Sequence, residues 1–245
     1  MKSNKYQKRF YRDWVKAQDL HLTHIIDKET DLVMLTNKRL DKDFIRERIR
    51  VYRCEIENYI AKDRRFLVAL KPIEVELKAP KIIQTMSAAA KKANVGPMAT
   101  VAGAIAQFLG EDLLREGYKD VIIENGGDIF LSTRKSRKIG IYAGKSRLWK
   151  GLCLKINPKD TPLGVCTSSG TIGHSLSFGS ADSVVILSKN TSLADAVATA
   201  TANLVKIRKD LQPALDFARS VEGISGAVII LKNNMISWGK VEFVK

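Results

Sequence analysis

GVCTSSGTIGHSLSFGSADSVVILSKNTSLADAVATATAN, residues 164–203, joins a loop rich in glycine and serine to an apolar run and an alanine-rich segment. Residues 183–187 (SVVIL) are short and β-branched, which is typical of a sheet strand. Asn190 is followed by Thr191 and Ser192, and all three are good N-cap residues for the helix that the alanines predict. On that helix Asp195 and Thr199 are four residues apart and share one face. A carboxylate and a hydroxyl are therefore expected to project together beside the loop.

Composition limits the class of protein. The chain has 245 residues, is 45% hydrophobic and carries a formal charge of +15, enough for one sizeable core or two small ones. Lysine and arginine are spread along the chain and no zinc-finger or RNA-binding signature occurs, so we expect an anionic small molecule as the partner and not nucleic acid. Three cysteines without CxxC spacing, no signal peptide and no membrane-length apolar run predict a cytoplasmic protein with no membrane segment.

The remaining pattern predicts an antiparallel sheet combined with helices, an α+β fold. A helix beginning near Pro97 is rich in small residues, and its free amides favour an anion. The strands are expected at 6–14, 20–26, 30–35, 66–70, 139–142, 151–156, 164–167, 227–231 and 235–238, with the last turn at Asn233–Asn234, and the other helices at 41–61, 81–93 and 211–219.

The segment between the apolar runs 121–123 and 129–131 reads Glu124-Asn125-Gly126-Gly127-Asp128. Asn-Gly between two such runs is a strong hairpin signal, so the turn needs no function to explain it. Two glycines between carboxylates also leave bare backbone, which suits close approach of a ligand. We therefore expect the helix start near Gly96, this turn and the loop after Cys166 to form one ligand-binding cleft.

Five motifs together resemble the UPF0280 family: KETDL (28–32), NVGPMATVAGAIAQ (94–107), ENGGDIFLS (124–132), GVCTSSGTIGHSLSFGSADS (164–183) and ADAVATATAN (194–203). That family is similar to ApbE, the FAD:protein FMN transferase. The resemblance implies an ApbE-like T-fold, with antiparallel sheet packed against helices, in a single domain over 1–245. It also suggests two pseudo-repeated halves, about 1–117 and 118–245.

The resemblance further implies a flavin nucleotide with magnesium, the metal being held by Asp195 and Thr199. His174 would correspond to a histidine of the transferase, although HSLSFGSAD replaces the DPxTG pattern expected after it. No second carboxylate for the metal is identifiable from the sequence. The cofactor-binding residues are expected to be Gly96, Asn125, Gly126, Gly127, Asp128, Thr167, Ser168, Ser169, Gly170 and Thr171.

Cys166 suggests a different function. The donor-rich turn that follows it, His174 eight residues on and the cationic chain are expected to lower its thiol pKa and favour the thiolate. The UPF0280 resemblance also implies sulfide assimilation into homocysteine in anaerobes. Our main hypothesis is therefore a sulfur carrier acting through a persulfide on Cys166, with Cys54 as the relay thiol, sulfide and a partner protein as its partners, and a homo-oligomeric state. The alternatives are an FMN transferase or related flavin enzyme, and a non-catalytic nucleotide-binding protein.

Overall fold

The computed structural model describes residues 19–142, 149, 151–170 and 179–245. Within them an eight-stranded antiparallel sheet has the order β1-β2-β3-β4-β7-β8-β9-β10, and a second sheet has the order β11-β6-β5. The predicted strand at 6–14, Thr171 and His174 lie outside the described residues. The main-sheet strands are β1 (His21–Asp27), β2 (Thr30–Thr36), β3 (Val121–Asn125), β4 (Asp128–Ser132), β7 (Leu163–Ser168), β8 (Ser183–Ser188), β9 (Ile224–Leu231) and β10 (Asn234–Gly239), and the small-sheet strands are β5 (Arg137–Gly140), β6 (Cys153–Ile156) and β11 (Phe243–Val244).

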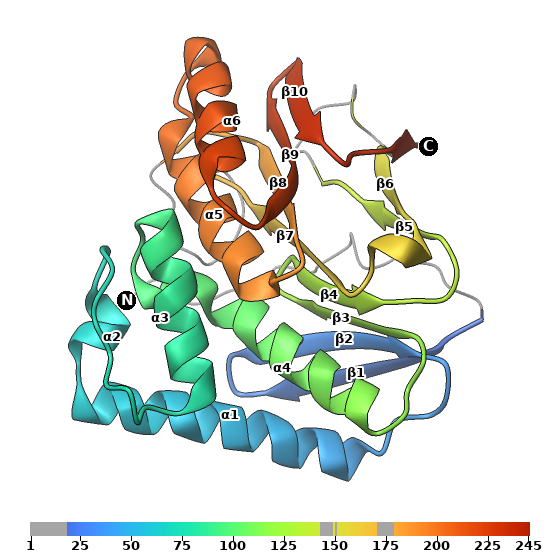
Figure 1. Cartoon of the computed structure of the whole chain (residues 1–245). Coiled ribbons are helices and arrows are strands. Elements are labelled where there is room, and N and C mark those ends of the chain that lie inside the picture. The colour runs from blue at the N-terminus through green and yellow to red at the C-terminus, as the bar shows by residue number, and fades with distance from the viewer. Residues whose placement is uncertain (1–18, 143–148, 150, 171–178) are drawn as a thin grey trace.

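Helices cover one face of the main sheet, and the small sheet covers part of the other (Figure 1). One core lies under α5 and α6, a second lies among α1, α3, α4 and strands β1 to β4, and a third, made of aliphatic side chains, lies between the two sheets. The helices are α1 (Lys42–Lys62), α2 (Arg65–Val68), α3 (Lys81–Ala93), α4 (Val101–Arg115), α5 (Thr191–Leu204) and α6 (Leu211–Ser220), with 3₁₀ turns η2 (Pro97–Thr100), η3 (Pro158–Asp160) and η4 (Arg208–Asp210).

The helix caps explain why several helices begin where the sequence predicts. Asp41 caps α1 by accepting the amides of Asp43 and Phe44, and the Asn190 side chain accepts the Leu193 amide at the start of α5. Each cap satisfies donors that the first helical turn leaves without a partner. The predicted α+β fold is confirmed.

Two local predictions are wrong. Residues 66–70 were expected to form a strand, but α2 is a helical turn because the Asp63 side chain accepts the Arg65 amide at 3.0 Å and the buried Phe66 packs edge-on against Tyr59. The last hairpin turns at Lys232–Asn233, one residue earlier than expected, since Asn234 already pairs with Leu231 and Lys232 takes the positive φ.

Helices α4 and α5 approach each other closely. A Cβ at Gly103 would lie 2.7 Å from the Thr191 carbonyl oxygen and 2.8 Å from Asp195 Cβ, distances that real Cβ atoms do not adopt. Gly103 is therefore required for the contact, and the alanines of α5 keep the rest of that helix narrow enough to be buried on nearly all sides. This packing places Asp195 against the start of α4.

No helix in the described ranges has the length and apolar character that a bilayer span requires. The pseudo-repeat of two halves stays a prediction.

Candidate functional site

Strand alternation brings two predicted residues of the site together on the helix-covered face of the sheet. Asp128 on β4 is the register partner of Cys166 on β7. Their chain neighbours Ile129 and Val165 belong to the core between the two sheets, on the opposite face, as the two-residue period of a strand requires. Asp128 and Cys166 therefore face α5.

Asp195 completes this cluster from α5. Its Oδ2 accepts the amide of Gly103 at 2.9 Å, in the first turn of α4. Amides at a helix start carry partial positive charge and have no partner inside the helix. The binding of an external anion near Pro97 stays a prediction, since the group held at the Gly103 amide is the chain's own Asp195.

The two aspartates share a buried, carboxylate-rich environment. Asp128 is 7% exposed and Asp195 is 8% exposed. Burial raises the pKa of Asp195 to about 7, and burial together with the charge of Asp195 raises the pKa of Asp128 well above its ordinary range. Within the described part of the chain, Asp128 Oδ1 is buried without a hydrogen-bond partner. A proton or a cation would relieve both the repulsion and the orphaned acceptor.

The prediction of a lowered thiol pKa is wrong for Cys166. The side chain is fully buried, and burial, followed by the charges of Asp128 and Asp195, raises the pKa of its thiol well above the ordinary value. Its Sγ donates to the Thr191 carbonyl at 3.3 Å. A thiol in this environment is held protonated, whereas a sulfur nucleophile must be a thiolate.

The predicted relay thiol is placed differently. Cys54 is exposed on α1 and its sulfur accepts a hydrogen bond from Asn58 Nδ2 at 3.2 Å. Helix α1 packs on α3 and α4 (Figure 1), whereas Cys166 belongs to the core formed with α5. Because Cys166 is inaccessible, the geometry gives no support to a relay between these cysteines.

The β3–β4 hairpin forms as the Asn-Gly signal predicts, and side chains hold it in place. Asn125 Nδ2 donates to the Ala102 carbonyl at the start of α4 at 3.1 Å, and Glu124 Oε1 accepts the Gly127 amide at 2.8 Å. Gly126 and Gly127 have φ values of 69° and 106°, which side chains other than glycine rarely adopt. The hairpin tip is thereby a fixed, bare edge between the two faces of the sheet.

The other predicted cofactor-binding residues divide into two groups. Thr167 and Ser169 line a pocket between the sheets. Gly96 and Gly170 instead allow close backbone packing, because a Cβ would lie 1.7 Å from the Ala69 carbonyl oxygen in one case and 2.2 Å from the Gly179 carbonyl oxygen in the other. Ser168 ends β7, and Thr199 is half-buried one turn after Asp195.

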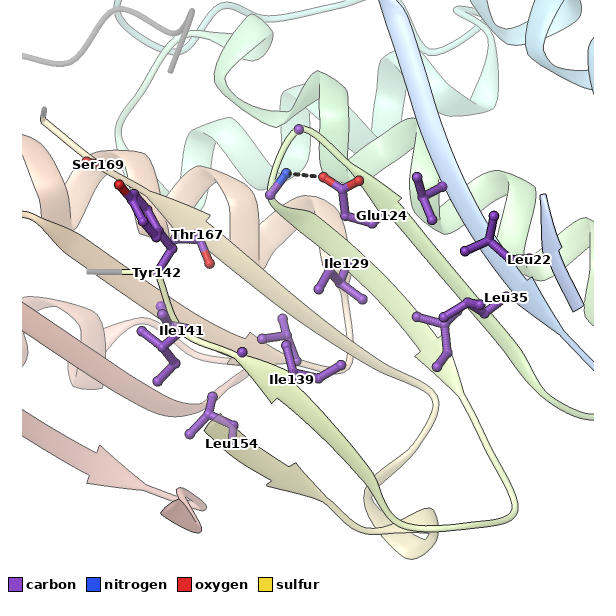
Figure 2. Close-up of a pocket in the computed structure, with 17 residues that line it drawn as sticks. Leu22, Leu35, Glu124, Ile129, Ile139, Ile141, Tyr142, Leu154, Thr167 and Ser169 are labelled. Atoms are coloured by element: carbon purple, nitrogen blue, oxygen red, sulfur yellow. Dashed lines mark hydrogen bonds between the residues drawn. The ribbon is translucent and has the colours of Figure 1, made fainter. Parts of the chain in front are cut away.

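The pocket lies on the face opposite to Asp128 and Asp195, between the main sheet and strands β5 and β6 (Figure 2). Its volume is about 120 Å³. The deep part is aliphatic, while the end near the hairpin carries Glu124, Tyr142, Thr167 and Ser169. The hairpin edge thus lies between an acidic cluster and an apolar pocket.

Comparison with known proteins agrees with this architecture. The family profile described as AbpE bacteria matches residues 12–237. A UPF0280 protein of Methanosarcina acetivorans is 40% identical over 219 residues, covering 89% of this chain and 86% of its own length, and one of Methanocaldococcus jannaschii is 41% identical over 230 residues, covering 90% and 92%. The chain belongs to the UPF0280 family.

Solved structures show the fold of this UPF0280 protein. The apo form of the Pseudomonas stutzeri flavinyl transferase ApbE aligns with a TM-score of 0.60 at 12% identity, over 90% of this chain and 94% of its own. The flavin transferase ApbE from Vibrio cholerae aligns with a TM-score of 0.59 at 13% identity, over 90% and 97%. The predicted ApbE-like fold is confirmed.

Sequence reasoning missed two features of the site. Asp128 was expected to contact flavin, and no second carboxylate was assigned to the metal beside Asp195. The signal was present in the β4 alternation, since Asp128 must face the helices if Ile129 faces the other core. The apolar pocket had no sequence signal, because its lining comes from strands distant in the chain.

Proposed function

We propose that this protein is an ApbE-like enzyme that binds a flavin nucleotide with magnesium and transfers the flavin-phosphate part to an acceptor. The observation that carries the proposal is the buried pair Asp128 and Asp195 beside the fixed glycine hairpin, in a fold shared with flavin transferases. The ligand is then an anionic small molecule, in keeping with a chain of formal charge +15.

The residues present fit a magnesium ion. Magnesium takes oxygen ligands, commonly one or two carboxylates together with substrate phosphates. Asp128 and Asp195 supply two carboxylates, and the orphaned Asp128 Oδ1 is an oxygen of the required kind. Thr199 adds a hydroxyl on the same helix face. In the described ranges no group of three or more His, Cys, Asp or Glu side chains is placed to hold a metal, so the remaining ligands would come from hydroxyl, backbone and phosphate oxygens.

The bound metal would supply charge neutralisation for the pyrophosphate oxygens. The chain's own residues fix the geometry. Gly103 donates to Asp195 and holds one carboxylate oriented, while Asn125 ties the hairpin to the same helix start. The bare backbone of Gly126 and Gly127 lets a ligand approach the sheet edge closely.

Calorimetric titration with FAD, with and without magnesium, tests the proposal. We expect magnesium-dependent binding, and Asp195→Asn should weaken it at least about tenfold because a charged ligand of the metal becomes neutral. Release of AMP from FAD in the presence of magnesium would report the transfer chemistry. Asp128→Asn should behave like Asp195→Asn.

Asp216→Asn is the matched control, since Asp216 lies on the neighbouring helix α6 and its side chain contacts only Gln212 among the hydrogen bonds described. It should leave FAD binding unchanged. FAD affinity that is equal with magnesium and with chelator, or equal in Asp195→Asn and the parent protein, would overturn the proposal.

A further inference from the structure

A second cleft lies at the other end of the main-sheet strands from the β3–β4 hairpin. Leu163, which begins β7, is buried and lines this cleft, whereas the hairpin lies beside Thr167 near the end of the same strand. The chain leaves β10 and crosses to the small sheet, where β11 pairs with β6 (Figure 1). Residues of this crossing, of β6, of η3 and of the segment after β8 line the cleft. Its volume is about 620 Å³, which is within the range of about 300–1,000 Å³ for small-molecule sites.

Lysines from separate segments of the chain converge on this cleft. They are Lys155 on β6, Lys159 in η3, Lys189 between β8 and α5, and Lys240 after β10. Their charges outnumber those of the carboxylates in the lining, Asp160 and Glu242. Because like charges repel, an anion bound among the lysines would stabilise this arrangement.

Glu242 is shared by two of the lysines. Its Oε1 lies 2.8 Å from Lys155 Nζ. Its pKa is lowered, first by the hydrogen bonds from Lys155 and Asn157, and further by the charges of Lys155 and Lys159. A single carboxylate therefore faces two ammonium groups on this side of the cleft.

Asp160 also faces two lysines, and it neutralises them incompletely. Its Oδ1 lies 3.7 Å from Lys240 Nζ, a separation longer than a hydrogen bond. The Lys189 Nζ donates to the backbone carbonyl of Asp160 at 2.6 Å and not to the carboxylate. A carbonyl has no net charge, so this bond leaves the charge of Lys189 in place. The pair of Lys62 and Glu76, at 2.7 Å, shows the one-to-one arrangement found elsewhere on the surface.

The side chains of the lining favour phosphate groups as the anion. Among the described residues of the lining none is an arginine and none is aromatic. The arginine fork matches planar carboxylates with two parallel hydrogen bonds, whereas a lysine ammonium binds phosphate oxygens as a point charge. Nucleic-acid bases are commonly held by stacking on aromatic side chains. A phosphate ligand without a base therefore fits this lining best.

We propose that this cleft binds a compact oligophosphate anion without an aromatic group, held by the ammonium groups of Lys155, Lys159, Lys189 and Lys240. The site is separate from the acidic cluster on the helix-covered face, because it lies on the small-sheet side and at the opposite end of the strands from the hairpin. The assignment does not depend on the proposed function.

Inorganic triphosphate is the probe, used in chelator so that no magnesium links it to the acidic cluster. Calorimetric titration should show a single site whose affinity falls as the salt concentration rises, because salt screens the charges. The double variant Lys159→Ala/Lys189→Ala should bind triphosphate at least about tenfold more weakly. Both lysines are exposed, so folding is retained, and urea denaturation checks this.

Lys78→Ala/Lys81→Ala is the matched control because it removes the same net charge. Both lysines are exposed, at and just before the start of α3 in the helix layer, away from the cleft. This variant should keep its triphosphate affinity within about twofold of the parent protein. Binding of FAD with magnesium should be the same in both double variants and in the parent protein.

Each alternative has its own result. Equal loss of triphosphate affinity in the two double variants would show attraction by net charge alone and overturn the assignment. Citrate bound as tightly as triphosphate would contradict the phosphate class, and ATP bound at least about tenfold more tightly than triphosphate would contradict a ligand without an aromatic group. These three results leave the proposed function standing. Loss of FAD binding in folded Lys159→Ala/Lys189→Ala would overturn the separation of the two sites.

Discussion

Strands β3, β4 and β7 have two faces of opposite character. On the face toward α4 and α5 they bury Asp128 and Cys166 beside Asp195, and on the other face the same strands bury Ile129 and Val165 in an aliphatic layer. One sheet thickness thus separates a buried pair of carboxylates from an aliphatic layer. A one-residue slip in the pairing of these strands would move every side chain to the other face and so exchange the two surfaces. The register of the strands therefore determines both surfaces at once.

The largest expected effect is the difference in alkylation rate between the cysteines. It tests whether the helix-covered face of the sheet is closed. Cys54 is exposed, Cys153 is partly buried and Cys166 is fully buried. Since burial and two nearby carboxylates raise the thiol pKa of Cys166, we expect its alkylation in the native protein to be at least about a thousandfold slower than that of Cys54. Iodoacetamide labelling with peptide mass spectrometry measures the rates.

Labelling in denaturant is the control, because all three cysteines should then react at similar rates. Native alkylation of Cys166 as fast as that of Cys54 would show that the helix-covered face is open. It would also return the persulfide hypothesis to consideration.

The second prediction concerns the stability of the acidic face, where Gly103 packs against Asp195. Gly103→Ala places a Cβ against the Thr191 carbonyl oxygen and Asp195 Cβ, neither of which can move without shifting α5. Overpacking of this kind costs about 3 kcal/mol of unfolding free energy, to be measured by urea denaturation. FAD binding should weaken in the same variant, because Asp195 is displaced.

Gly117→Ala is the matched control at the end of α4. Gly117 has φ of 79° with nothing within 4 Å of an added Cβ, so this substitution tests backbone strain without crowding and should cost about 1 kcal/mol. A smaller loss in Gly103→Ala than in Gly117→Ala would contradict the close approach of α4 and α5.

Local patterns made much of the fold predictable. The helix carrying Asp195 and Thr199 follows from its cap and alanines, and the hairpin follows from Asn-Gly between two apolar runs. The run FLVAL at 66–70 failed because a short apolar run does not distinguish strand from helix. There the deciding contacts, Asp63 to Arg65 and Tyr59 to Phe66, involve neighbouring residues, but the periodicity of the run does not express them.

The site was predictable only in part because its electrostatics are non-local. The sequence places Cys166 near donors and in a cationic chain, yet its pKa is raised by burial and then by the charges of Asp128 and Asp195, on another strand and on a helix. Net charge says nothing about which charges burial brings together. The pocket is harder still, since Leu22, Ile122 and Ile139 are neighbours only once both sheets have formed.

The smallest expected effect is the pH dependence of the unfolding free energy. It tests whether ionisation of the buried Asp128 and Asp195 destabilises the folded protein. In metal-free protein Asp195 has a folded pKa of about 7 against an ordinary value of 3.8, so between these values the folded state binds more protons than the unfolded state. Stability contributed by the protonated pair is therefore present at low pH and is lost as the pH rises through about 7. We expect the unfolding free energy to fall by about 2 kcal/mol between about pH 5.5 and 8, measured by urea denaturation in chelator.

The pH window and the variant isolate this pair. The carboxylates whose pKa is lowered, such as Asp19, Glu29 and Asp210, are already ionised above about pH 5.5, so they add no slope there. Asp195→Asn should flatten the pH dependence, because Asp128 then has no charged neighbour on α5. Magnesium should restore stability to the parent protein more at pH 8 than at pH 5.5, since a cation binds the ionised carboxylates. A parent protein whose stability is flat or rises across this range would show that Asp128 and Asp195 are not buried together as an acidic pair.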